Sequence, residues 1–143
     1  MSMIRLTVPA GSLTPEGRKT VQRELADALL RCEGAPDAAF FRAQLWSYLV
    51  ELPDGAQTTA ADDAPRFLVD VTVPQFVLSE EGRTRLVAEA TGIVLSAAGL
   101  TGADAPRVWV LVHEQPDGTW GAGGSIVRHA DLVALAQKQH AAE

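Results

Sequence analysis

Side chains that bind metals or move protons are sparse in this sequence, and their spacing argues against a metal site. The three histidines are His113, His129 and His140. His113 precedes Glu114, but a helical zinc motif needs a second histidine four residues after the first, and the sequence has none there. We therefore expect no metal site and no cofactor.

Two further segments have a chemical interpretation and a structural one. Gly121-Ala122-Gly123-Gly124 is rich in glycine, like a phosphate-binding loop, but it lacks the Lys-Ser/Thr pair of a P-loop and the spacing of a dinucleotide fingerprint. We interpret it as a tight hairpin. The single cysteine, Cys32, falls on an apolar helical stripe and is expected to be a buried thiol, and one cysteine excludes a disulfide scaffold.

Anion binding is the remaining chemistry that the side chains suggest. Four arginines lie on or beside predicted strands: Arg5, Arg42, Arg66 and Arg107. In an oligomer one of them could reach a neighbour's cavity, although a surface ion pair is the ordinary role for each. Trp120 is interpreted either as an aromatic at a pocket mouth or as a packing residue.

The composition describes one folded domain and excludes several classes of protein. The chain has 143 residues, of which 47% are hydrophobic and 21% are charged. This apolar content excludes disorder, and no apolar run reaches the roughly 18 residues of a membrane span. With 12 basic and 18 acidic residues, the net charge of −6 opposes nucleic-acid binding. The first residues lack the organisation of a signal peptide, so a cytoplasmic protein is expected.

The sequence repeats itself, which is its most informative property. At a shift of 65 residues, Thr7-Val8-Pro9 aligns with Thr72-Val73-Pro74, and Glu16-Gly17-Arg18 aligns with Glu81-Gly82-Arg83. At a shift of 63, Trp46 aligns with Trp109, Glu51 with Glu114, and Pro53-Asp54-Gly55 with Pro116-Asp117-Gly118. Ordered matches over about fifty residues indicate duplication, and they favour a structural role for the two recurring glutamates.

Each copy is predicted to form a strand, a helix and a second strand. β-Branched and aliphatic residues predict strands over Ile4–Val8, Ala43–Glu51, Phe67–Val73 and Arg107–Glu114. Thr14 and Ser79 are good helix N-caps, and Gly34 and Gly99 are good C-caps. Between these caps the apolar residues form one stripe in each copy: Val21, Leu25, Ala28, Leu29 and Cys32, matched by Leu86, Ala90, Ile93, Val94 and Ala97.

These elements predict one α/β (α+β) domain over residues 1–143. It comprises two fused β-α-β repeats, at about 1–55 and 66–124, and a C-terminal strand and helix over 125–143. Four strands form a sheet with two helices on one face. Because the strands are apolar at nearly every position, we expect other subunits to cover the second face, in a trimer. A ferredoxin-like dimer, whose units pair in an antiparallel sheet, is the structural alternative.

The repeat resembles the tautomerase superfamily, which includes 4-oxalocrotonate tautomerase, the chloroacrylic acid dehalogenases and macrophage migration inhibitory factor. The segment from Val108 to Gly124 is similar to the family's second strand, turn and closing aromatic-Gly-x-Gly-Gly hairpin. The start, Ile4 to Leu13 with Thr14-Pro15-Glu16, is similar to its first strand and the beginning of its helix. The resemblance covers most of the chain and implies a homotrimer with inward-facing sheets.

The resemblance also implies where a site would lie. The family uses an amino-terminal proline as general base or acid, and in this chain Ser2 stands at that position. The loops that carry carboxylate-binding arginines in family enzymes contain none here, and the second of them, Pro74–Leu78, offers Gln75. We therefore expect Ser2 as the catalytic position and Trp120, Arg107 and Gln75 as substrate-binding residues, with Arg107 chosen from the four arginines beside strands.

Two functions follow from this resemblance. In the first, the chain is an isomerase, a keto–enol tautomerase of small 2-oxo acids or related carboxylates. The amine of Ser2 or Met1 would be the base, and catalysis would be atypical or absent because the proline is missing. Alternatively it is a non-catalytic trimeric binding or assembly protein that retains the fold. Neither function involves nucleic acid or a membrane.

Overall fold

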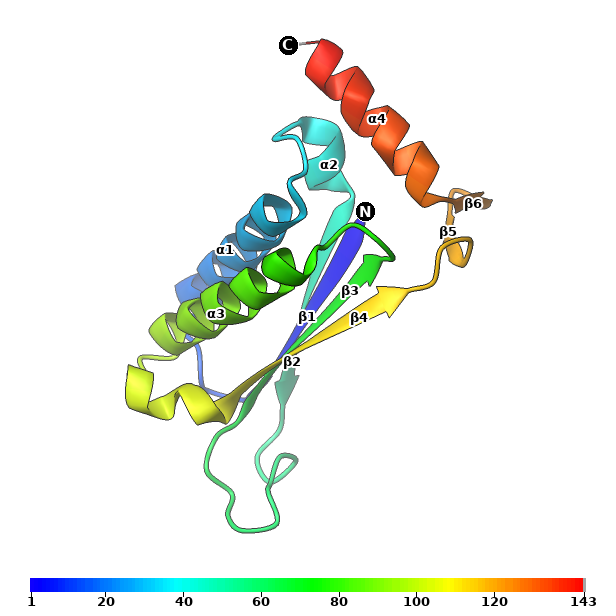
Figure 1. Cartoon of the computed structure of the whole chain (residues 1–143). Helices are drawn as coiled ribbons and strands as arrows, with labels where there is room; N and C mark the ends of the chain where they lie inside the picture. Colours follow the sequence, from blue (N-terminus) through cyan, green and yellow to red (C-terminus); the bar gives the residue numbers. More distant parts are fainter. Residues whose placement is uncertain (143) are drawn as a thin grey trace.

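A computed structural model describes residues 1–142, which form two strand–helix–strand units followed by a hairpin and a final helix (Figure 1). The first unit comprises β1 (Ser2–Pro9), α1 (Pro15–Glu33), α2 (Ala39–Ala43) and β2 (Leu45–Leu52). The second comprises β3 (Phe67–Pro74), α3 (Glu80–Ala97), the 3-10 helix η1 (Gly102–Arg107) and β4 (Val108–Gln115). The last part comprises β5 (Trp120–Ala122), β6 (Ser125–Val127) and α4 (His129–Ala141).

The sheet has the order β2-β1-β3-β4 and confirms the predicted fold class. Within each unit the two strands are parallel, since β1 pairs with β2 and β3 with β4. The two units meet where β1 and β3 run antiparallel. Both α1 and α3 cover the same face of this sheet (Figure 1). The parallel pair inside each unit rules out the ferredoxin-like alternative.

Both long helices begin at the residues that the repeat indicated, but only α1 ends on its predicted glycine cap. The hydroxyl oxygens of Thr14 and Ser79 accept hydrogen bonds from the N–H groups of Gly17 and Gly82, each at 2.9 Å. Gly34 caps α1 in the left-handed conformation, with φ of 66°. In the second copy the C-cap is Ala98, and Gly99 follows it with φ of 67°. The duplicated caps therefore fix where both helices turn back to the sheet.

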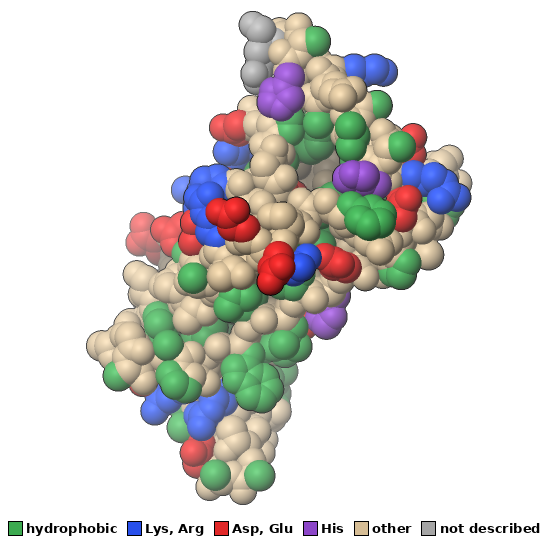
Figure 2. Space-filling view, in the orientation of Figure 1, with side chains coloured by type: hydrophobic (Ala, Val, Ile, Leu, Met, Phe, Trp, Pro, Cys, Tyr) green, Lys and Arg blue, Asp and Glu red, His purple; other side chains and the backbone are tan. Residues whose placement is uncertain are grey.

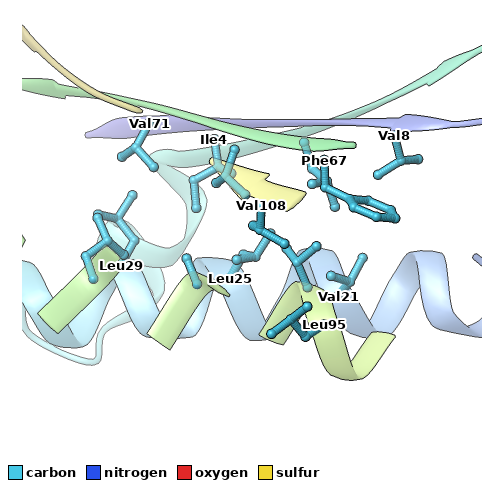
Figure 3. Close-up of a cluster of buried hydrophobic side chains, with 14 of the residues drawn as sticks. Ile4, Val8, Val21, Leu25, Leu29, Phe67, Val71, Leu95 and Val108 are labelled. Carbon is cyan, nitrogen blue, oxygen red and sulfur yellow. The ribbon is translucent and has the colours of Figure 1, made fainter. Parts of the chain in front are cut away.

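The core fills the space between the helices and the inner face of the sheet (Figure 3). The helical stripe is buried at Val21, Leu25, Leu29, Leu86, Ala90 and Val94. Cys32 is half-buried against this cluster, and desolvation raises the pKa of its thiol. The sequence predicted a buried thiol, whereas Cys32 is only half-buried; its raised pKa disfavours the thiolate.

The recurring glutamates are joined to the helices by ion pairs. Arg18 Nε lies 2.5 Å from Glu51 Oε1, and Arg83 Nη1 lies 2.9 Å from Glu114 Oε1. The four residues occupy equivalent positions in the two copies. Each pair links the first turns of a long helix to the far end of the strand that follows it, which accounts for the recurrence.

The outer face of the sheet is exposed in the single chain. Trp46 and Trp109 are 60% and 69% exposed, so neither belongs to the chain's own core. Tyr48, Val50 and Leu111 are also exposed on this face, because alternate residues of β2 and β4 point away from the helices. Polar residues lie between these apolar edges: Arg5 Nε is 4.0 Å from Asp70 Oδ2, and His113 Nε2 is 3.0 Å from Asp70 Oδ1.

Several element boundaries differ by one or two residues from the sequence-based prediction. Ala43 ends the short helix α2, which is anchored by the buried ring of Phe41, and β2 starts only at Leu45. Arg107 ends η1, and β4 starts at Val108. The final helix, predicted within 125–143, begins at His129, because the Asp131 carboxylate accepts the Arg128 N–H at 2.8 Å. Among the described residues, no helix is long and apolar enough to cross a membrane.

Candidate functional site

Two cavities meet at Met1, beside the start of β1. The outer cavity, of about 530 Å³, lies against the C-terminal hairpin. Its lining includes Met1, Ser2, Gln44, Trp46, Gln115 and Trp120. The structure thus brings together two of the residues singled out in the sequence, Ser2 and Trp120. The start of β1 is held beside β2, where the Ser2 N–H donates to the Gln44 carbonyl oxygen at 3.0 Å.

The inner cavity lies on the helical side of Met1, beneath α4. It measures about 190 Å³, and Figure 2 shows the surface hollowed where α4 meets the rest of the chain. Most of its lining is apolar, contributed by Phe41, Phe76, Val77, Leu132, Val133 and Ala136. Its two ionisable side chains are Glu33, the last residue of α1, and His129, the first residue of α4.

Glu33 is held by Ser2 at the start of β1. Ser2 is buried, at 2% exposure, and its hydroxyl donates a hydrogen bond to Oε1 of Glu33. Desolvation raises the pKa of the Glu33 carboxyl to about 7, against the opposing effects of the Ser2 hydrogen bond and the positive amino terminus. Burial also lowers the pKa of the Met1 amino group, although the Glu33 charge opposes this shift. The site therefore contains a carboxyl group that can accept or release a proton near neutral pH.

Phe76 lines the inner cavity from a strained turn and remains largely exposed. Its φ of 78° lies in the left-handed region, which side chains other than glycine rarely occupy. The equivalent residue in the first copy is Gly11, with φ of 80°. The duplication has thus kept the backbone conformation while replacing glycine by phenylalanine. The Phe76 ring packs edge-on against His129, with 5.5 Å between ring centroids.

His129 is fixed at the cavity by its backbone and its ring. Its N–H donates to Oδ1 of Asp117 at 2.8 Å, which ties the first turn of α4 to the turn after β4. Its ring nitrogen Nδ1 is buried and has no hydrogen-bond partner among residues 1–142. A buried polar atom without a partner is unusual in a folded protein.

Gln75 lies outside both cavities and joins two segments of the site by hydrogen bonds. Its N–H donates to the Gln115 carbonyl oxygen at 2.8 Å, and its Oε1 accepts from the Asp117 N–H at 2.9 Å. The β3–α3 loop is thereby joined to the turn that also holds His129. Gln75 thus fixes the loop that carries Phe76.

Arg107 lies at the opposite end of the sheet from Ser2. It lines a third cavity of about 530 Å³, together with Arg66, Trp109 and residues of the linker. Its Nη1 is 3.7 Å from Asp104 Oδ1. Within residues 1–142, arginine lines neither cavity at Met1, and no group of three His, Cys, Asp or Glu side chains could hold a metal ion. Figure 2 shows basic and acidic side chains interspersed on the face it presents.

Sequence reasoning missed three residues of this site: Glu33, Phe76 and His129. Phe76 could have been found, because the repeat aligns it with Gly11 in a loop. Glu33 and His129 carry no sequence signal. They come together only because the end of α1 and the start of α4 flank the same end of the sheet.

The comparisons with known proteins concern the fold. The sequence matches no family model and no curated protein sequence. Solved structures match closely in shape at low sequence identity. One is Pt0534 inactivated by 2-oxo-3-pentynoate, which is 24% identical with a TM-score of 0.76, over 90% of this chain and 97% of that chain.

Two further structures extend the likeness. A fused 4-OT described as a symmetric trimer is 20% identical with a TM-score of 0.73, over 94% of this chain and 98% of that chain. N1, a member of the cis-3-chloroacrylic acid dehalogenase family, is 21% identical with a TM-score of 0.72, over 87% of this chain and 82% of that chain. The fold is therefore that of the tautomerase superfamily, as the resemblance implied.

Proposed function

We propose that this chain, which has the fold of the tautomerase superfamily, is an isomerase that moves a proton between carbon and oxygen of a small 2-oxo acid at the two cavities beside Met1. The hydrogen bond from Ser2 to Glu33 supports this proposal most directly, since it orients a partly buried carboxyl group at the start of β1. The class of substrate is suggested by Pt0534, which was solved after inactivation by 2-oxo-3-pentynoate, a 2-oxo acid.

Glu33 takes the role of general base. Its carboxylate removes a proton from the carbon next to the carbonyl group, and the C–H electron pair forms the carbon–carbon double bond. The carbonyl π pair moves to oxygen, which takes the same proton from the Glu33 carboxylic acid, so the enol forms and the carboxylate is regenerated without any other reactant. A base whose pKa is about 7 suits this transfer, because both of its protonation states are populated near neutral pH.

Ser2 orients the Glu33 carboxylate and does not itself act as the base. With Met1 ahead of it, the Ser2 nitrogen is an amide whose N–H is bonded to Gln44, and its hydroxyl is bonded to Glu33. The proline that the resemblance implies at this position would be a secondary amine with no hydroxyl. The proposed reaction therefore uses the same end of β1 with a different base.

We also propose that the chain forms a homotrimer through the outer face of its sheet. The outer face of the sheet carries exposed Trp46, Tyr48, Trp109 and Leu111, an arrangement typical of an interaction surface. A fused 4-OT of the same fold is described as a trimer. Packing three outer faces together would bury these side chains and leave the Met1 cavities at the rim of each sheet.

The test measures ketonisation of phenylpyruvate enol and solvent deuterium exchange into phenylpyruvate. We expect Glu33→Gln to lower kcat/KM by roughly 100-fold, which is at the lower end for loss of a general base. Glu24→Gln, on an exposed position of α1, is the matched control and should keep the wild-type rate. Equal rates in wild type and Glu33→Gln would refute the role of Glu33.

One observation favours the second function, a non-catalytic trimeric binding protein. Among the described residues, the cavities at Met1 contain no arginine to hold a substrate carboxylate. If this function holds, phenylpyruvate binds without deuterium exchange above the buffer rate in the wild-type protein. Exchange that depends on Glu33 would exclude it.

A further inference from the structure

The third cavity, beside the linker, is the counterpart of the outer cavity in the other copy of the repeat. Met3 pairs with Trp46 between β1 and β2, and Leu68 pairs with Trp109 between β3 and β4. Each of these pairs lines a cavity of about 530 Å³. Every residue that lines the outer cavity, apart from Thr119, has its counterpart in the lining of the third. The duplication has therefore produced the same cavity twice, at opposite ends of the sheet.

The two cavities differ in charge. Met1 and Gln44 of the outer cavity correspond to Arg66 and Arg107 of the third. Arg66 is already paired, since its Nη2 lies 3.1 and 3.3 Å from the two carboxylate oxygens of Asp62. The third cavity thus has two guanidinium groups where the outer cavity has the side chains of methionine and glutamine.

Arg107 supplies a cation that a ligand can reach. Its side chain is 38% exposed, and its ion pair with Asp104 is long, at 3.7 Å between Nη1 and Oδ1. Within the described part of the chain, its guanidinium group makes no hydrogen bond. A guanidinium group binds a carboxylate through two parallel hydrogen bonds, so Arg107 is suited to hold the carboxylate of a ligand.

The rest of the lining indicates the kind of anion. Leu68, Pro106 and the exposed ring of Trp109 place apolar surface in the same cavity as the guanidinium group. A concave site of this kind matches a ligand with one carboxylate and an apolar body better than an inorganic anion. The linker side of the cavity is fixed to the start of β3, because Gln57 Oε1 accepts the Arg66 N–H at 2.8 Å.

We propose that the third cavity is a second binding site, in which the Arg107 guanidinium group holds the carboxylate of a small organic anion and the apolar part of this anion lies against Trp109. Because Arg66 and Arg107 directly precede β3 and β4, the site lies at the rim of the sheet, as the outer cavity does. It is independent of the isomerase site, since it uses no residue of the Met1 cavities.

This second site binds its ligand without converting it. Ser2 and Glu33 of the first copy correspond to Phe67 and Ala98 of the second. The second copy therefore has neither the carboxyl group that removes a proton in the proposed isomerase reaction nor the hydroxyl group that orients it. The duplicated cavity keeps the shape of the first and replaces its chemistry by anion binding.

The experiment measures binding of 3-phenylpropanoate, a carboxylate with an aromatic end and no ketone to isomerise. The indole ¹H–¹⁵N signals report the site, because Trp109 lines the third cavity and the other two tryptophans line the outer one. Trp109→Phe assigns the signal, which should shift and saturate in the wild type. Arg107→Gln should bind roughly 10- to 100-fold more weakly, as for loss of a hydrogen bond to a charged group. Arg23→Gln, on an exposed position of α1, removes the same charge and should bind as the wild type does.

Each outcome decides one part of the proposal. A titration that shifts only the signals of Trp46 and Trp120 would overturn the second site. Equal affinity for 3-phenylpropan-1-ol, which has the same shape without the charge, or unchanged affinity in Arg107→Gln, would refute the role of Arg107. Glu33→Gln should leave binding at Trp109 unchanged while it lowers deuterium exchange. The second site therefore stands or fails separately from the isomerase proposal.

Discussion

The hydroxyl group of Ser2, at the start of β1, donates a hydrogen bond to the carboxyl group of Glu33, at the end of α1, 31 residues along the chain. This bond joins the two elements of the first repeat at the point where both cavities meet. It also links the stability of the fold to the ionisation of one carboxyl group.

The first prediction is that stability falls as pH rises from about 4.5 to about 7. The folded-state pKa of Glu33 is about 7, above the ordinary glutamate value of 4.5, so the folded chain binds this proton more tightly than the unfolded chain does. The stabilisation that this bound proton provides is fully present below pH 4.5 and is lost as the pH rises through about 7. Glu33→Gln, which cannot ionise, should be more stable than wild type at pH 8 by about 1–3 kcal/mol. Urea unfolding at pH 4 and pH 8 measures both proteins, and a wild type that gains stability over this range relative to Glu33→Gln would contradict the prediction.

The second prediction concerns Ser2→Ala. The Ser2 hydroxyl stabilises the ionised form of Glu33 and so opposes the rise of its pKa. Without this hydroxyl, the pKa of Glu33 should move further upward, and the acidic limb of the kcat/KM profile should shift to higher pH with it. Ser12→Ala, in the loop before α1, is the control. An unchanged profile would show that the hydrogen bond does not act on Glu33.

The third prediction is an inverted order of stability at position 76. Glycine adopts the left-handed conformation of Phe76 without strain, whereas alanine keeps the strain and loses the ring. Phe76→Gly should therefore be more stable than Phe76→Ala by about 1 kcal/mol, the reverse of the usual order. Gly11→Ala, at the equivalent turn of the first copy, should be destabilised by a comparable amount. Thermal unfolding measures all three, and a more stable Phe76→Ala would mean that the turn changes conformation.

The fourth prediction uses the matched glycines near the starts of α1 and α3. A Cβ added to Gly82 would lie 2.9 Å from the Cys32 carbonyl oxygen, which belongs to the backbone of α1. A Cβ added to Gly17 would meet the Thr14 hydroxyl at 3.0 Å and the Ala97 carbonyl oxygen only at 4.0 Å. We expect Gly82→Ala to lose roughly 1–3 kcal/mol because the helices must move apart, and Gly17→Ala to change stability by less than about 1 kcal/mol. Equal losses would show that helix separation does not limit the packing.

The fifth prediction tests the exposed outer face. Trp46→Lys and Trp109→Lys place charges on the surface that we propose to be shared in a trimer. Light scattering should give the mass of three chains for the wild type and a smaller assembly for the double variant. The unfolding midpoint of the dissociated chain should remain measurable, because neither side chain belongs to its core. A wild-type mass of one or two chains would refute the trimer.

The sequence by itself determined the architecture of this protein. The repeat, the capping residues at Thr14 and Ser79, and the apolar stripes predicted two strand–helix–strand units with the helices on one face, because these features act over a few residues. Ser2 and Trp120, which the sequence singled out, both line the outer cavity. The position of Arg107, by contrast, followed only from its proximity to a strand, and the fold puts it at the other end of the sheet.

Only the tertiary structure decided which side chains share the site. Glu33, Phe76 and His129 lie on α1, on a loop and on α4, and no local pattern connects them. Their proximity depends on how the antiparallel meeting of β1 and β3 brings the start of one repeat beside the loop of the other. The raised pKa of Glu33 has the same origin, because desolvation comes from residues that are distant in sequence and packed together only in the fold.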